Sequence, residues 1–139
     1  MKFRSDPSQI RGSIAPVVTP FDADGAVDHA ALARLVDWQI ESGSHGISVQ
    51  GSTGEPSSQT IEEREAALET AARTVADRVP FLPGTGSAIL EETLRLTARA
   101  SELGVVLSLE PTNPLRTGSE AATNTIGIVA VARCAATTD

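Results

Sequence analysis

The 139-residue chain is long enough for one domain with a buried core, and its 40% hydrophobic content argues against wholesale disorder. A net charge of −7 disfavours nucleic acid and anionic membranes as partners, but it does not disfavour a small anion held in a local pocket. Because Cys134 is the single cysteine and there are two histidines, the composition excludes an internal disulfide and offers no convincing metal site.

The first eleven residues are polar and lack the apolar core of a signal peptide, and no apolar run is long enough to span a bilayer. We therefore expect a cytoplasmic protein. A β-branched run predicts a first strand at Ile14–Val18, although Pro16 favours an edge or strand-end position. The turn at 22–25 looks superficially like a calcium loop, but Val27 and Ala33 stand where an EF-hand requires glycine and glutamate.

Two helices with recognisable start signals follow. Asp28 is a favourable N-cap for a helix that ends before Gly43, and the apolar residues between them recur at helical spacing. Thr60 and Glu63 match the capping-box pattern that opens a second, longer helix. Its early acidic residues, Glu62 among them, are interpreted as solvated charges near a helix N-terminus rather than as paired catalytic carboxylates.

The most informative stretch lies between these helices. An apolar run at 46–49 predicts a second strand, and Gly51-Ser52-Thr53-Gly54-Glu55 follows it. Backbone N–H groups in such a glycine-flanked turn can form an anion-binding nest, and the hydroxyls of Ser52 and Thr53 add donors of their own. The loop suits a small carboxylate or a phosphate, although an ordinary strand-to-helix turn can have the same composition.

A second glycine-hydroxyl loop, at 84–87, follows an apolar run at 79–83. Ser87 is a candidate N-cap for a third helix that Gly104 would end. The apolar face of this helix is predicted to carry Leu90, Leu94 and Ala98. The loop is not a dinucleotide-binding fingerprint, because Ile89 stands where the third glycine would be.

A fourth strand is predicted at 105–109, so strands and helices alternate along the chain. This alternation predicts an α/β fold with a parallel sheet and helices packed on it. Right-handed crossovers would place all strand-to-helix loops on one side, so both glycine-hydroxyl loops should open together. Beyond a turn-rich segment at 111–119, either a strand at 126–131 or a poor helix at 121–136 is possible.

Five of these segments occur in the order and spacing of the dihydrodipicolinate synthase and N-acetylneuraminate lyase family, which the chain resembles. They are Ala15–Phe21, Asp24–Asp28, Gly51–Glu55, Thr60–Arg64 and Gly84–Gly86. The resemblance covers roughly 11–104 and implies the N-terminal half of a (β/α)8 TIM barrel, about (βα)3β plus an atypical tail. It implies one partial domain: a lead-in at 1–11, a family-like part at 12–104 and a divergent tail at 105–139.

The resemblance also implies class I aldolase chemistry, in which a lysine forms a Schiff base with pyruvate for carbon–carbon bond formation or cleavage, without a metal or organic cofactor. Ser52 and Thr53 match the hydroxyl pair that holds the pyruvate carboxylate, and Gly51 and Gly54 would shape the loop. Serine in the first position is closer to the lyase branch of the family. Pyruvate or a related 2-oxo acid is therefore the expected ligand, and Glu55 is expected to be structural.

The catalytic residues of the family are not matched. The sequence has no tyrosine, and Leu109–Asn113 stands where the family has a proline and two tyrosines. Lys2, the one lysine, matches neither the position nor the buried setting of the Schiff-base lysine. We therefore assign no catalytic residue and expect a chain inactive alone. Truncation or a frameshift is the favoured hypothesis; a non-catalytic carboxylate-binding or assembly module and a chain completed by a second chain are the alternatives.

A half barrel would leave sheet edges unpaired, so we expect self-association or poor solubility. Ile47, Val49 and Leu82 are expected to face the barrel interior and to lack an opposite layer there. A small complete domain of flavodoxin type is a further interpretation. It requires a fifth strand near 126–131 and leaves the family motifs unexplained.

Overall fold

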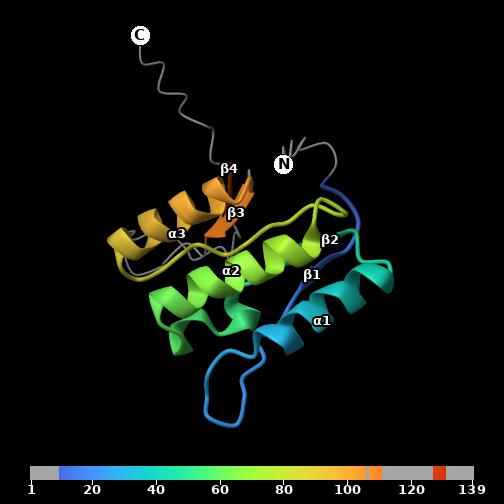
Figure 1. The fold of residues 1–139 in the computed structure, drawn as a ribbon. Helices are drawn as coiled ribbons and strands as arrows, with labels where there is room; N and C mark the ends of the chain where they lie inside the picture. The colour runs from blue at the N-terminus through green and yellow to red at the C-terminus, as the bar shows by residue number, and fades with distance from the viewer. Residues whose placement is uncertain (1–9, 106, 111–126, 131–139) are drawn as a thin grey trace, which may run out of the picture.

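The computed structural model describes residues 10–105, 107–110 and 127–130 of the chain (Figure 1). The elements are β1 (Ile14–Pro16), α1 (His29–Glu41), β2 (Gly46–Ser48), the 3₁₀ helices η2 (Ser52–Gly54) and η3 (Pro56–Ser58), α2 (Ile61–Val75), α3 (Leu90–Glu102), β3 (Leu107–Glu110) and β4 (Gly127–Ala130). No helix within these described residues is both long enough and apolar enough to cross a membrane.

The first two strands form the predicted parallel pair. Ala15 of β1 lies opposite Ile47 of β2 in the register. The predicted strand at 79–83 joins them only through a parallel bridge between Ile47 and Phe81. Backbone bonds nevertheless continue along it, since Ile47 N donates to Pro80 O at 3.0 Å and Leu82 N to Ile47 O at 2.8 Å. Three parallel segments thus lie side by side, in the order β1, β2 and 80–84.

Helices α1 and α2 bury the apolar faces that the spacing of their residues predicts. Helix α2 lies between α1 and α3, and it contacts both (Figure 1). Leu32 and Val36 of α1 and Leu68 of α2 are at most 1% exposed. Together with residues of the sheet they form one continuous core, which contains Val17, Leu32, Val36, Ile47, Val49, Ala67, Leu68, Ala71, Val75, Phe81 and Leu96.

Two of the three helix starts agree with the sequence. Asp28 Oδ1 accepts a bond of 2.8 Å from Ala31 N at the start of α1. At the start of α2, Thr60 Oγ1 accepts from Glu63 N at 3.2 Å and the Glu63 carboxylate accepts from Thr60 N at 2.8 Å, which completes the capping box. The cap predicted at Ser87 is wrong, because α3 begins after Ile89 without a side-chain cap.

The buried face predicted for α3 is also wrong. Leu90 and Leu94 are 63% and 62% exposed, whereas Leu96 and Ala100 are almost fully buried. Both pairs have the i, i+4 spacing of an apolar stripe, so spacing alone cannot choose between them. The buried side carries Leu96, which joins the core, and the neighbouring Arg95 and Arg99 form surface ion pairs with acidic residues of α2. The acidic partners are Glu62, Glu65 and Glu69.

The inner surface expected for the sheet needs a similar correction. Ile47 and Val49 belong to the core formed with α1 and α2, so they face the helices. Because side chains alternate along a strand, Ser48 points to the opposite side of the sheet. Ile47 and Val49, which were expected to lack an opposite layer, are therefore covered by the helices and are at most 2% exposed. Leu82 is not part of this core, but it is also buried, at 3% exposed.

The predicted fourth strand exists as β3, but it does not extend the parallel sheet in the described structure. It pairs antiparallel with β4, with Leu107 opposite Ala130. Of the two alternatives left open for the tail, the strand near 126–131 is the one found. The flavodoxin-type interpretation requires a strand in this place, but β4 pairs antiparallel with β3, unlike the parallel sheet of such a domain. Residues 111–126, including the segment compared with the family tyrosines at 111–113, lie outside the described residues.

Candidate functional site

The two glycine-hydroxyl loops meet at the end of the parallel sheet, as predicted. Gly84 N donates to Val49 O at 2.7 Å. A Cβ atom placed on Gly84 would lie 2.2 Å from the carbonyl oxygen of Gln50. This approach is closer than any side chain allows, so glycine at position 84 brings the segment after Phe81 against the start of the Gly51–Glu55 loop.

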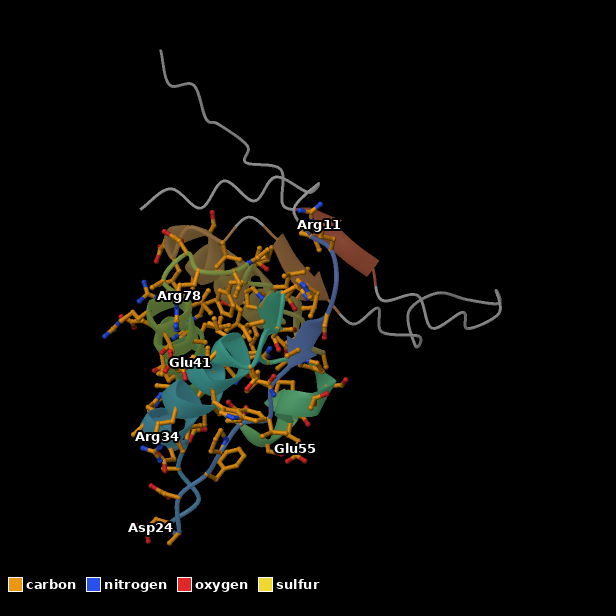
Figure 2. All side chains as sticks on the ribbon, turned by 90° about the vertical axis from the view of Figure 1, so that its right-hand side faces the viewer. Arg11, Asp24, Arg34, Glu41, Glu55 and Arg78 are labelled. Atoms are coloured by element: carbon orange, nitrogen blue, oxygen red, sulfur yellow. The ribbon has the colours of Figure 1, made fainter. Side chains whose placement is uncertain are left out.

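The Gly51–Glu55 loop is a short 3₁₀ turn that leaves polar groups facing outward. Gly54 N and Glu55 N bond within the turn, to Gly51 O at 2.9 Å and Ser52 O at 3.3 Å. Ser52 and Thr53 are exposed, and no hydrogen bond within the described part of the chain uses their N–H groups or hydroxyls. Glu55 is exposed at the surface, where Figure 2 labels it. Two N–H groups and two hydroxyls are therefore available to an acceptor.

Two side chains from separate segments of the chain hold this loop at its buried glycine, Gly54. Gly54 O accepts from Thr19 Oγ1 at 2.8 Å and from Gln59 Nε2 at 2.9 Å. Gln50 is 2% exposed, and its Nε2 donates to Gln59 Oε1 at 2.8 Å. The backbone of Gln50 has φ of 59°, a left-handed conformation that non-glycine residues adopt at a cost. The loop is thus fixed by a polar network and not by its glycines alone.

A buried arginine connects this network to the second loop. Arg64 is 4% exposed, and its Nε donates to Gln50 Oε1 at 3.3 Å. Its Nη2 donates to Gly86 O at 3.0 Å and to Gly84 O at 3.4 Å. Burial lowers the pKa of the Arg64 guanidinium, an effect that the negative charge of Glu92 opposes. An arginine remains protonated at neutral pH, so a positive charge lies beneath both loops.

The second loop supports the first instead of offering hydroxyls of its own. Thr85 is fully buried, and its Oγ1 lies 3.0 Å from the hydroxyl of Thr97 in α3. Gly84 and Gly86 contribute carbonyl groups to Arg64. The two loops have similar sequences but different roles. The first exposes its hydroxyls, whereas the second places the Thr85 hydroxyl in an internal contact with Thr97.

Glu62 and Glu65, near the start of α2, bind an arginine of α3, whereas Glu63 belongs to the capping box. Arg95 of α3 pairs with Glu62 at 3.1 Å and with Glu65 at 2.7 Å. The hydrogen bond from Arg95 lowers the pKa of Glu65. Glu62 and Glu65 thus share one arginine partner and do not form a carboxylate pair that would raise a pKa. Within the described residues, no cluster of three or more His, Cys, Asp or Glu could hold a metal ion.

Gln50, Gln59 and Arg64 were not singled out by the sequence patterns, although a signal for Arg64 exists. It falls in line with Leu68 and Ala71 on the stripe of α2 that faces the core. A charged residue on a buried stripe must find polar partners, so it points to an interior polar network. Gln50 and Gln59 carry no such signal, because both lie in turns and not on a periodic stripe of a helix or strand.

Comparisons with known proteins agree with this architecture. A model of the dihydrodipicolinate synthetase family matches residues 9–112. A 4-hydroxy-tetrahydrodipicolinate synthase of Thermus thermophilus is 55% identical over 94 residues, which are 68% of this chain and 31% of that protein. The chain thus spans about one third of the length of this relative.

Solved structures of the family show the same fold over that part. The chloride-inhibited dihydrodipicolinate synthase from Acinetobacter baumannii, complexed with pyruvate, has a TM-score of 0.68 and 39% identity, covering 73% of this chain and 35% of that one. N-acetylneuraminate lyase from Mycoplasma synoviae has a TM-score of 0.67 and 31% identity, covering 70% and 34%. By sequence and by fold, this chain belongs to the dihydrodipicolinate synthetase family.

Proposed function

We propose that the chain carries the carboxylate-binding part of a dihydrodipicolinate synthase-like, pyruvate-dependent lyase or aldolase. In this proposal the chain corresponds to the N-terminal half of a (β/α)8 barrel. Family membership and the pyruvate bound in the Acinetobacter baumannii relative support it. The ligand is pyruvate or a related 2-oxo acid.

The observation that carries the proposal is the set of donors at Ser52 and Thr53. Both residues are exposed, and their N–H groups and hydroxyls have no acceptor within the described residues. Each hydroxyl would donate to a carboxylate oxygen, and the buried Arg64 adds a positive potential beneath the loop. Gly51 and Gly54 shape the turn, with Gly54 held by Thr19 and Gln59.

A titration of the ¹⁵N-labelled chain with pyruvate tests this proposal. We expect the largest amide shifts at Ser52 and Thr53, with smaller shifts at Gly51 and Gly54. Acetone, which has the ketone but no carboxylate, is the control and should leave these amides unmoved. If pyruvate shifts other regions but not this loop, the assignment of the site is wrong.

The chain is expected to bind pyruvate without forming a Schiff base. In that step a lysine amine attacks the pyruvate carbonyl carbon, water leaves, and borohydride can reduce the resulting imine to a stable secondary amine. The nucleophile must be a deprotonated amine, which family enzymes obtain from a buried lysine. Lys2, the one lysine of this sequence, lies outside the described residues, and the sequence contains no tyrosine.

Borohydride treatment with pyruvate, followed by mass spectrometry, should therefore show no stoichiometric adduct on the folded chain. The variant Lys2→Arg and the urea-unfolded chain measure the background of adventitious reaction at exposed amines. An adduct that forms fully on the folded chain, but is lost in Lys2→Arg and in urea, would contradict the prediction.

A further inference from the structure

Among the arginines of α2 and α3 in the described structure, Arg64 has contacts of a different kind. Arg95 and Arg99 lie at the surface of the helix pair and bind carboxylates. Arg64 is buried, and its hydrogen bonds go to the Gln50 side-chain oxygen and to the carbonyl oxygens of Gly84 and Gly86. Among the residues that the structure describes, no ion pair joins Arg64 to a carboxylate.

The contacts of Arg64 form a continuous chain of hydrogen bonds between the two loops. On one side, Nη2 binds the carbonyl groups of Gly84 and Gly86. On the other, Nε binds Gln50 Oε1, Gln50 Nε2 donates to Gln59 Oε1, and Gln59 Nε2 donates to Gly54 O. Because Gly54 directly follows Thr53, this chain ends at the backbone of the exposed hydroxyl pair.

We propose that Arg64 is a positioning residue: it joins the loop at 84–86 to the loop at 51–55 and thereby holds Ser52 and Thr53 in the geometry that receives a carboxylate. The role in carboxylate binding rests on the proposed function. The coupling between the loops rests on the contacts alone and can be measured without a ligand. Arg64 touches neither hydroxyl, so it acts through Gln50 and Gln59.

The shape of the guanidinium, and not its charge alone, is what this role requires. A planar fork can bind Gln50 with Nε and two carbonyl groups with Nη2 at the same time. A lysine ammonium at the same position carries the same charge on one nitrogen and cannot span both loops. Arg64→Lys therefore separates a connecting role from a purely electrostatic one.

The test compares Arg64→Lys with Arg73→Lys, a matched change at an exposed arginine of the same helix. Amide hydrogen exchange and pyruvate affinity are both measured on the 139-residue chain. In Arg64→Lys we expect at least tenfold faster exchange at Gly54 and Gly84, whose N–H groups bond to Gly51 O and Val49 O. We also expect at least tenfold weaker pyruvate binding, with exchange at Leu68 unchanged. Arg73→Lys should match the wild type in every measurement.

A second variant keeps the test decisive if the buried substitution prevents folding. Gln59→Ala removes the last link to Gly54 and leaves Arg64 in place, and it should also weaken pyruvate binding at least tenfold. Wild-type affinity in Arg64→Lys or in Gln59→Ala would overturn the proposal. If the wild-type chain does not bind pyruvate, the proposed function fails, and exchange at Gly54 and Gly84 still decides whether Arg64 couples the loops.

Discussion

Replacing Ser52 with alanine and Thr53 with valine is expected to abolish measurable pyruvate binding while leaving the fold intact. Each hydroxyl donates to no other group in the described structure, so its removal should disturb no internal contact. A hydrogen bond to a charged group is worth about 1.5–3 kcal/mol, and two of them correspond to a loss of about a hundredfold or more in affinity. Valine has nearly the same shape as threonine, so Thr53→Val removes the hydroxyl and leaves the size of the side chain unchanged.

The measurement is the same ¹⁵N titration with pyruvate, accompanied by thermal unfolding of both chains. The double variant Ser57→Ala with Ser58→Ala is a matched control, because these serines are exposed in the neighbouring turn η3. It should bind pyruvate as the wild type does. Unchanged affinity in the Ser52 and Thr53 variant, with unchanged melting temperature, would remove both residues from the site.

Local signals predicted the starts of α1 and α2 because the interactions they encode are local. The capping box of Thr60 and Glu63 needs only four consecutive residues, and Asp28 caps α1 through a residue three positions away. The place of the loop at 51–55 after a strand was likewise read from its own residues. The exposure of its hydroxyls was not, because the similar loop at 84–87 buries Thr85.

Features that depend on distant neighbours were missed or wrong. Which face of α3 is buried depends on its packing against α2, about thirty residues earlier, where Arg95 also binds Glu65. The strand β3 was predicted and β4 was one of two alternatives, but their antiparallel pairing was not predicted, since β-propensity does not encode pairing direction. The supporting role of Arg64 depends on carbonyl groups twenty residues away, at Gly84.

The close approach of the Gly84 backbone to the Gln50 backbone gives the largest expected loss of stability. Gly84→Ala would place a methyl carbon 2.2 Å from Gln50 O, 2.6 Å from Gln50 C and 2.9 Å from Gly51 N. All three are backbone atoms, so no flexible side chain can move aside. Overpacking costs about 1–3 kcal/mol and occasionally more, and we expect a loss of about 3 kcal/mol in the free energy of unfolding.

The direction of the stability change distinguishes overpacking at Gly84 from the usual effect of replacing glycine with alanine. Where space and backbone angles allow it, glycine-to-alanine replacement stabilises a protein by about 0.4–1 kcal/mol, because it restricts the unfolded chain. Gly51→Ala is the matched control: its φ is −77°, and the nearest atom to the new methyl carbon is Ser48 Oγ at 3.9 Å. Its stability should stay within about 0.5 kcal/mol of the wild type. Urea unfolding of the three chains measures the difference. If Gly84→Ala is as stable as Gly51→Ala, then the two loops are not in the contact on which the geometry of the site depends.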